Sequence, residues 1–263
     1  MIFMKRFCEY SRLIVRKLIL IFFTMFLLVS CNSKYYNNFE IPAVGPNDNI
    51  IFHTGFTVSY DTATLIPKWV AYELTAEEAQ GEFPRSKTFC SDPDFNGRQA
   101  IRDDYSNSGW DKGHMAPAAD MKWSEESMLE SFYLTNICPQ NHSLNERDWQ
   151  TLEKKVRGWA FEYGCIYVVC GPIIGANQYG TIGANRVVVP DAFFKALMVP
   201  EGKSYKTIAF IMMNSNERHS IKEYALSVNE LEKITGIDFF PHLNDREEEL
   251  IENQVNCKSW NIN

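Results

Sequence analysis

The sequence predicts one α+β domain built around a mainly antiparallel sheet. Strand patterns open the folded part, because residues 50–60 and 69–74 are rich in β-branched and aromatic residues and end at turn residues. A long amphipathic helix follows in the middle of the chain, and after it come more buried-strand patterns and a short helical pair. Strands and helices that do not alternate regularly indicate an α+β architecture rather than a parallel α/β one.

The remaining elements follow from local signals. Residues 81–110 are rich in Gly, Pro, Asp, Ser and Arg, which predicts a long functional loop. The clearest helix begins near Ser143, whose spacing to Glu146 is that of a capping box, and it ends at Gly164. Its apolar residues recur at 149, 152, 156, 159, 160 and 163, the period of one helix face. We also expect a helix at 124–131, strands at 132–137, 165–170, 186–189 and 207–213, and helices within 221–240 that end at Gly236.

Residues 1–30 are predicted to be a signal peptide that ends at a lipobox. Basic residues precede a run from Leu18 to Val29 that is apolar except for Thr24. This run is shorter than the about 20 residues that a membrane-spanning helix needs. The tetrad at 28–31, Leu-Val-Ser-Cys, resembles the lipobox of bacterial lipoproteins, in which the cysteine is lipidated and becomes the mature N-terminus.

We therefore expect a lipid on Cys31, a tether over residues 31–48 and a folded domain over 49–263. A chain of this kind would lie in the bacterial cell envelope, anchored by its lipid to a membrane. The outer membrane is the expected one, with the domain facing the periplasm or the cell surface. The alternatives are an uncleaved anchor and a plain signal peptide.

The net charge limits the ways in which this chain can bind a polyanion. The formal net charge is −7, and loss of residues 1–30 removes five basic residues and one acidic residue, which makes it −11. An acidic protein is not an obvious nucleic-acid binder. Binding to phosphates must therefore come from a few locally placed cations.

The cysteines do not predict a zinc site or a fixed set of disulfides. Outside the predicted signal peptide and lipobox there are Cys90, Cys138, Cys165, Cys170 and Cys257. An odd number leaves at least one thiol free within a single chain. Cys165 and Cys170 lie in one predicted strand and point to opposite faces, too far apart to pair. The sequence leaves open whether any disulfide forms among the five.

The segment before the long helix carries a candidate base. His114 follows Asp111, Lys112 and Gly113. The glycine allows close backbone approach, and the lysine can reach a phosphate. A neutral imidazole accepts a proton near pH 7, and the unperturbed pKa of histidine is about 6.5.

The helix itself carries a candidate metal ligand and two charged groups. Asn145 in its first turn offers a carbonyl oxygen, a hard ligand suited to Mg²⁺, and the helix N-terminus favours a phosphate. Glu153 and Arg157 follow at i,i+4 spacing. A base, a hard cation and positive charge suit phosphodiester hydrolysis. In the alternative, purely structural interpretation, Asn145 only starts the helix, and Glu153 and Arg157 form a solvated ion pair.

Three ordered motifs resemble those of the DNA/RNA non-specific endonucleases, the ββα-metal (His-Me finger) family that includes endonuclease G. The motifs are Asp-Lys-Gly-His-Met-Ala-Pro at 111–117, Thr-Asn-Ile-Cys-Pro-Gln at 135–140, and Leu-Asn-Glu-Arg-Asp-Trp-Gln-Thr-Leu-Glu at 144–153. The resemblance implies a central antiparallel sheet with a ββα motif. It also implies DNA and RNA as substrates, and Mg²⁺ as the cofactor, with Mn²⁺ or another divalent cation as alternatives.

The same resemblance assigns roles at the matching positions. His114 matches the general base that takes a proton from water, and Asn145 matches the single protein ligand to the metal. Glu153 matches the acid that supports the metal's water shell, and Arg157 and Arg85 match basic residues that contact phosphates.

Lys112 departs from the family pattern, in which arginine is the commoner residue. Lysine lacks the bidentate fork of arginine, so we expect reduced rather than abolished activity. Asp111 belongs to the motif without an assigned chemical role. His142 lies close to Asn145 in sequence and is a rival base, although a surface position near the helix start is the simpler expectation.

Two other functions remain open from the sequence. One is a catalytically idle lipoprotein that binds ligands at the surface, and the other is a phosphodiesterase for a small or non-nucleic-acid diester. The sequence does not decide between DNA and RNA, nor does it identify the physiological metal, the membrane leaflet or the biological role. It also leaves open whether the protein is a homodimer.

Overall fold

A seven-stranded sheet forms the centre of the computed structural model, which describes residues 38–262. Its strand order is β1-β2-β3-β6-β9-β10-β11, and every neighbouring pair is antiparallel. The strands are β1 (Asn49–Phe52), β2 (Thr57–Asp61), β3 (Ile66–Thr75), β6 (Cys165–Ile173), β9 (Ala192–Glu201), β10 (Ser204–Met213) and β11 (Ala225–Leu226). The predicted α+β class with an antiparallel sheet is confirmed.

The inner strands are apolar on both faces, because each face is covered. On β3, Val70 and Tyr72 belong to one hydrophobic cluster, whereas Trp69 and Ala71 belong to a second. The strands β6, β9 and β10 divide their residues between the two clusters in the same alternating way. Successive side chains of a strand point to opposite faces, so the sheet separates two cores.

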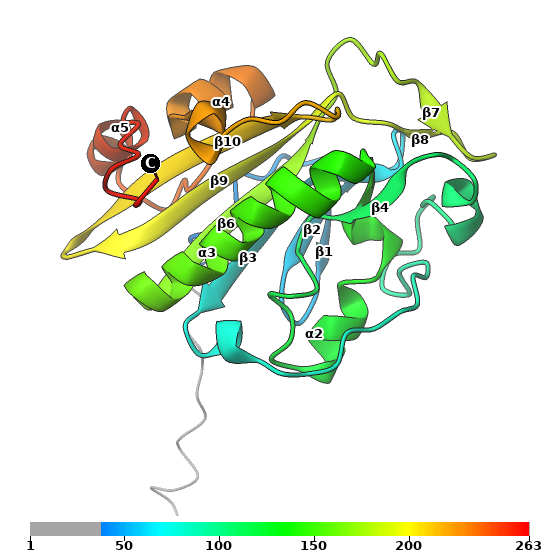
Figure 1. Ribbon diagram of the computed structural model, residues 1–263, viewed down its shortest axis with the longest axis horizontal. Coiled ribbons are helices and arrows are strands. Elements are labelled where there is room, and N and C mark those ends of the chain that lie inside the picture. Colours follow the sequence, from blue (N-terminus) through cyan, green and yellow to red (C-terminus); the bar gives the residue numbers. More distant parts are fainter. Residues whose placement is uncertain (1–37, 263) are drawn as a thin grey trace, which may run out of the picture. The chain divides into compact units, whose positions relative to one another are not determined.

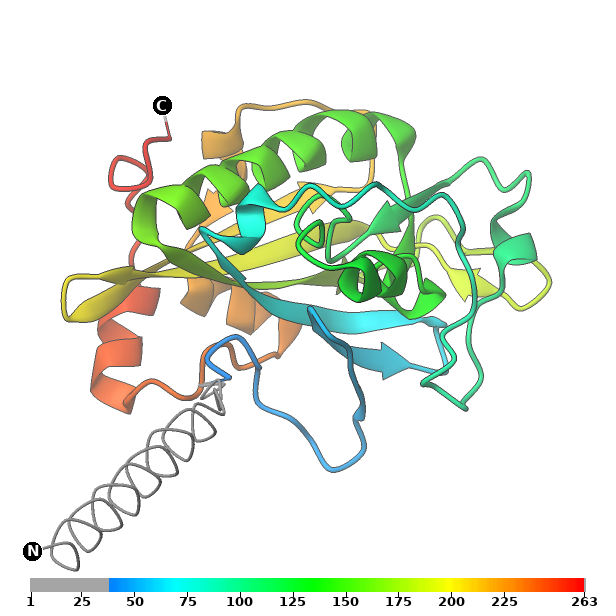
Figure 2. The ribbon, with the colours of Figure 1, turned by 90° about the horizontal axis from the view of Figure 1, so that it is seen from below.

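Helices lie on both sides of this sheet, as Figure 1 and Figure 2 show. The long helix α3 (Gln150–Tyr163) crosses one face, where it packs through Leu152 and Val156. The opposite face carries α4 (Val228–Thr235) and α5 (Asp245–Glu252). Gly164 ends α3 with a φ of 86°, a value at which a side chain would be strained.

A second, two-stranded sheet lies on the α3 side. It pairs β4 (Asp111–His114) with β5 (Ile137–Gln140), and the π-helical turn η4 (Leu144–Trp149) leads from β5 into α3. This order of two strands and a helix is the predicted ββα motif. The remaining elements are α2 (Glu125–Glu130), the pair β7 (Thr181–Ile182) and β8 (Val187–Val188), and the 3₁₀ turns η1 (Glu78–Gln80), η2 (Arg102–Tyr105), η3 (Leu134–Asn136) and η5 (Ile221–Tyr224).

Several predicted boundaries are wrong. Residues 50–60 form two strands with a turn between them, and the strand expected at 132–137 is the turn η3 followed by β5. The expected capping box is absent: Ser143 makes no capping bond, and Asn141 Oδ1 instead accepts the Ser143 backbone N–H at 2.9 Å. The Asn141 side chain therefore caps the helix, two residues before the capping residue that the sequence pattern suggested. The strand β9 and the helix α5 were not predicted at all.

The predictions about the cysteines and about the N-terminal segment have different outcomes. The five cysteines of residues 38–262 are all free. The prediction that Cys165 and Cys170 do not pair is confirmed. The predicted signal peptide, the lipidated Cys31 and the first part of the tether lie outside the described residues. Within the described part, no helix is both long and apolar enough to span a membrane.

Candidate active site

A cavity of about 500 Å³ lies where β4, α3 and the residue 85 loop meet. All the site residues predicted from the sequence line it: Arg85, Lys112, His114, Asn145, Glu153 and Arg157. Loop residues 117–119 and the helix residues Glu146, Gln150 and Lys154 complete the wall. Residues separated by up to about seventy positions thus converge on one space, which the sequence alone does not require.

The β4–β5 pair places His114 at the wall of this cavity. His114 pairs with Ile137, and the chain just after it is held by Asn136. The Asn136 side chain accepts the Ala116 backbone N–H at 2.9 Å and donates to the Ala116 carbonyl at 2.9 Å. Asn136 therefore fixes the turn that follows the histidine, a role that the sequence did not assign to it.

Gly113 is required by close packing between the two strands. A Cβ atom at this position would collide with the Gln140 side chain, which is buried on the neighbouring strand. The expectation that this glycine permits a close approach is confirmed. The approach is made by a side chain of β5.

The His114 ring is held in an apolar environment. It lies between Phe89, at 5.4 Å between ring centroids, and Phe132, at 4.9 Å. Its Nε2 atom is buried and has no hydrogen-bond partner among the described residues. Burial, together with the positive charge of Arg85, lowers the pKa of His114 to about 3. The expectation of an ordinary histidine pKa near 6.5 is therefore wrong, and the ring is neutral throughout the physiological range.

Asp111 holds the predicted metal ligand. Asn145 Nδ2 donates to Asp111 Oδ2 at 2.9 Å, so the carbonyl oxygen of the Asn145 amide points away from this contact. The same Asp111 oxygen lies 2.9 Å from His142 Nδ1. The His142 side chain is 68% exposed, which agrees with the expected surface position. The sequence left Asp111 without a role, and the structure gives it a positioning one.

The ion pair between Glu153 and Arg157 that the purely structural interpretation assumed is replaced by another. Arg157 Nη1 donates to Asp120 Oδ1 at 2.6 Å, and Asp120 also accepts from the Tyr72 hydroxyl at 2.8 Å. Asp120 is fully buried and lies just beyond the first motif. Nothing in the sequence around it indicated that it pairs with Arg157. Helical spacing alone could not show it, because Asp120 reaches Arg157 from a loop.

Glu153 therefore lacks the ion pair with Arg157 that the purely structural interpretation assigned to it. Burial raises its pKa to about 7, although the positive charges of Lys195 and Arg157 oppose the shift. Lys195 lies on β9, is fully buried and holds its ammonium group 4.6 Å from the Trp149 ring centroid. A divalent cation beside Glu153 would favour the charged carboxylate.

Two cations face the cavity without an acidic partner among the described residues. The Arg85 guanidinium lies 5.1 Å from the centroid of the Phe132 ring, and burial lowers the pKa of Arg85 without removing its charge. Lys112 Nζ lies 5.5 Å from the ring centroids of both Phe89 and Tyr105. Unpaired positive charge in a concave site is suited to a phosphate.

The donors in the cavity fit a hard divalent cation. The Asn145 carbonyl oxygen is oriented by Asp111, and Glu153 supplies carboxylate oxygens on the same helix. Mg²⁺ typically takes one or two protein oxygens and keeps several waters, so a large cavity with few donors suits it.

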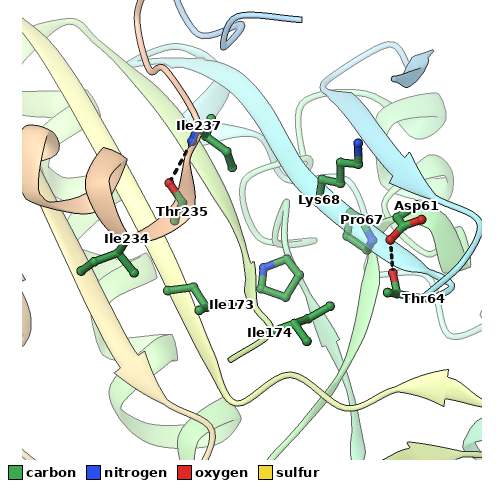
Figure 3. A pocket seen from close by; sticks show the side chains of 10 residues that line it. Asp61, Thr64, Pro67, Lys68, Ile173, Ile174, Ile234, Thr235 and Ile237 are labelled. Atoms are coloured by element: carbon green, nitrogen blue, oxygen red, sulfur yellow. Dashed lines mark hydrogen bonds between the residues drawn. The ribbon is translucent and has the colours of Figure 1, made fainter. Parts of the chain in front are cut away.

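A second cavity, of about 230 Å³, offers no comparable chemistry. Figure 3 shows its aliphatic lining: Ile173, Ile174, Ile234 and Ile237. Its charged groups are already paired, since Asp61 accepts from the Thr64 hydroxyl at 2.8 Å and Lys68 donates to Asp48 at 2.5 Å. The first cavity is therefore the candidate active site.

Comparison with known proteins decides the family. Residues 36–246 match the model of the DNA/RNA non-specific endonucleases. The chain belongs to this family. The resemblance stated from three sequence motifs is thereby confirmed, and it extends over most of the domain.

Relatives and a solved structure agree with this assignment. The chain is 34% identical over 226 residues to "Nuclease EXOG, mitochondrial" of Danio rerio, which covers 80% of this chain and 65% of that protein. It is 37% identical over 209 residues to the Xenopus laevis protein of the same name, covering 73% of this chain and 58% of that one. The chain thus spans about three fifths of the length of these two relatives.

The fold comparison reaches the same conclusion. The crystal structure of the EndoG/EndoGI complex matches with a TM-score of 0.74 at 28% identity, covering 83% of this chain and 96% of that chain. These relatives give no support to a bacterial lipoprotein, since the two named proteins are from animals and are called mitochondrial.

Proposed function

We propose that the chain is a metal-dependent endonuclease that hydrolyses phosphodiester bonds of DNA and RNA without sequence specificity. The observation that carries this proposal is the convergence of His114, Asn145 and two unpaired cations on one cavity. The names of the relatives, nuclease and endonuclease, agree with the reaction class.

His114 acts as the general base in this proposal. Its Nε2 atom is buried, so we assign Nδ1 as the nitrogen that accepts the proton of the attacking water. The lowered pKa keeps the ring unprotonated, but a base with a pKa of about 3 is a weak one. A phosphate bound beside Arg85 would offset the positive charge that contributes to the lowered histidine pKa, whereas burial, the larger cause, would still act.

Asn145 would hold the cation as its single protein ligand, and Glu153 would support the water shell of the ion, with Mg²⁺ as the expected ion and Mn²⁺ or another divalent ion as alternatives. When bound, the ion stabilises the negative charge that develops on the phosphate. Asp111 keeps the Asn145 amide in the required orientation. Glu153, with a pKa of about 7, would be ionised in the presence of such an ion.

Arg85, Lys112 and Arg157 bind the substrate phosphates. Arg157 is anchored by Asp120, which fixes the direction of its guanidinium, whereas Arg85 and Lys112 keep their full charge for the substrate. Because so few cations contribute and residues 31–263 carry a net charge of −11, we expect weak binding with a shallow dependence on salt.

The N-terminal segment supports a separate proposal about location. The basic segment, the short apolar run and the tetrad ending at Cys31 favour a lipid anchor in a bacterial envelope membrane. Intact-mass analysis of the protein from its native host tests this directly. A mature chain that begins at Cys31 and carries lipid is expected, and a chain that keeps residues before Cys31 or has an unmodified Cys31 would exclude it.

A cleavage assay tests the enzymatic proposal. The purified full chain is incubated with supercoiled plasmid, single-stranded RNA and bis(p-nitrophenyl) phosphate, each with Mg²⁺ and with excess chelator. We expect both nucleic acids to be cut with Mg²⁺ and neither with chelator. Turnover of the small diester alone would identify a phosphodiesterase of another kind, and binding without turnover would identify an idle relative.

A further inference from the structure

A cluster of one histidine and two carboxylates lies outside the cavity. His53 follows β1, Asp94 lies in the long loop, and Glu130 is the last residue of α2. One candidate ligand atom from each of the three lies within 4.8 Å of the others. None of these residues lines the candidate active site. The sequence showed no pattern that joins them.

The orientation of His53 points to a ligand. Its side chain is 0% exposed, and Nε2 lies 3.1 Å from Asp92 Oδ2. That contact places the proton of a neutral ring on Nε2 and leaves the lone pair on Nδ1. Nδ1 is buried, has no hydrogen-bond partner within residues 38–262, and lies 3.9 Å from Asp94 Oδ2 and 4.0 Å from Glu130 Oε1. The lone pair of His53 Nδ1 thus faces two carboxylates, and no positively charged group of the described residues lies between them.

Both anchoring acids are held in place. Asp92 accepts from the Thr135 hydroxyl at 2.5 Å, and although burial opposes it, hydrogen bonds from His53 and Thr135 keep the Asp92 pKa below its ordinary value. Glu130 accepts the Thr54 backbone N–H at 2.7 Å and the Thr54 hydroxyl at 3.1 Å. A histidine that binds a metal through one nitrogen commonly donates from the other to a carboxylate, which is the arrangement of Asp92 and His53.

We propose that His53, Asp94 and Glu130 form a second divalent-cation site, which binds Zn²⁺ through one nitrogen and two carboxylate oxygens with water completing the coordination. Zinc bonds to these ligand types are about 2.0–2.2 Å long, so two ligand atoms on a tetrahedral ion lie about 3.4 Å apart. The Nδ1 separations of 3.9 and 4.0 Å are longer than this, and the three ligand atoms lie within 4.8 Å of one another, so the side chains must move closer together to bind the ion. The Asp94 side chain is 61% exposed and free to make this movement. The nitrogen ligand favours Zn²⁺ over Mg²⁺ or Ca²⁺.

The bound ion would stabilise one end of the wall of the candidate active site. It joins the turn after β1, the loop that carries Phe89 and Asp94, and the end of α2 just before Phe132. Phe89 and Phe132 are the two rings that enclose His114. The bound ion is therefore structural, since it holds the segments that shape the cavity without facing the cavity itself.

Zinc binding by the full chain tests this proposal without an activity measurement. Metal-free protein is titrated with ZnCl₂, and the bound equivalents and the Tm are measured for wild type, Asp94→Asn and His219→Gln. Asp94→Asn removes an exposed ligand with little risk to the fold. His219 is the matched control, an exposed histidine that lies 3.9 Å from carboxylates of both Glu217 and Glu223.

We expect zinc to raise the wild-type Tm by several degrees. Asp94→Asn should lose one bound equivalent and most of this shift, whereas His219→Gln should keep both. A His53→Gln variant should behave like Asp94→Asn if it folds. Equal zinc binding by wild type and Asp94→Asn would overturn the proposal. So would the absence of a wild-type Tm shift, which would mean that the carboxylates surround a protonated His53 instead.

Discussion

The central sheet and the wall of the cavity are built in different ways. Strands β9 and β10 pair along ten residues each, and their apolar side chains alternate between two cores. The segments behind the cavity wall instead depend on polar groups whose hydrogen-bond partners lie far away in the chain, such as Asp120 with Tyr72 and Asn214 with Asn141. Substitutions in the sheet should therefore lower stability, and substitutions in the wall should lower the rate. The predictions below test that separation.

The largest effect on the rate is expected from removal of the proposed metal ligand. Asn145→Ala should lower kcat/KM at limiting Mg²⁺ by at least about 10²-fold, which is about 2.7 kcal/mol. It should change the free energy of unfolding by only about 1 kcal/mol, because Asn145 is partly exposed and loses one hydrogen bond, to Asp111. Plasmid cleavage and urea unfolding measure the two quantities. A wild-type rate of the Asn145→Ala variant at limiting Mg²⁺ would exclude Asn145 as the metal ligand.

The largest effect on stability is expected inside the sheet. Leu197 on β9 is fully buried, and Leu197→Ala should reduce the free energy of unfolding by about 2–5 kcal/mol. The rate per folded molecule should not change. Leu250→Ala is the matched control, because Leu250 on α5 is 59% exposed and its loss should be nearly neutral. A large fall in rate for Leu197→Ala under conditions where it is folded would break the proposed separation.

A smaller effect is expected from the residue that orients Asn145. Asp111→Ala should weaken Mg²⁺ binding by about 10- to 100-fold, the usual effect of losing a partner that holds a ligand. His142→Ala removes the other partner of Asp111 and keeps the bond to Asn145, so it controls for disturbance of the turn. The dependence of the rate on Mg²⁺ concentration distinguishes the two variants. If they shift it equally, then Asp111 does not act through Asn145.

The smallest effect is expected from the departure at position 112. Lys112→Arg restores a bidentate phosphate donor and should hold or raise the activity. The Lys112 ammonium group lies over the rings of Phe89 and Tyr105, and an arginine can stack on the same rings. Steady-state kinetics on plasmid measure the change. A loss of more than about tenfold, roughly 1.4 kcal/mol, would mean that lysine has a specific role here.

The same contrast explains what the sequence could predict. The helix α3 and its end at Gly164 follow from the apolar periodicity and from a glycine at the helix end, both local signals. The roles proposed for His114 and Asn145 come from motifs that resemble those of the family, and the structure places both residues at the cavity. Asp120, which pairs with Arg157, could not be found, because a buried carboxylate in a loop has no pattern that names its partner.

Two further differences have separate causes. The His114 pKa of about 3 depends on Phe89 and Phe132 surrounding the ring and on Arg85 beside it, all from other segments. The capping residue was misplaced because the helix begins at residue 142, so the Asn141 side chain, and not that of Ser143, accepts the Ser143 backbone N–H. The pKa shift depends on contacts between distant segments, whereas the cap is a local feature.

The central claim is that the buried His114, and not the exposed His142, is the base. The most direct test compares the cleavage rates of His114→Ala and His142→Ala at saturating Mg²⁺ from pH 5 to pH 8. Because burial holds the His114 pKa near 3 in the free protein, protonation of a free-enzyme base should not reduce kcat/KM as the pH falls to 5. His114→Ala should lower the rate by at least about 10²-fold with DNA binding nearly unchanged, and His142→Ala should stay within about tenfold of wild type. The reverse ranking of the two variants would contradict the mechanism even if the protein cleaves DNA.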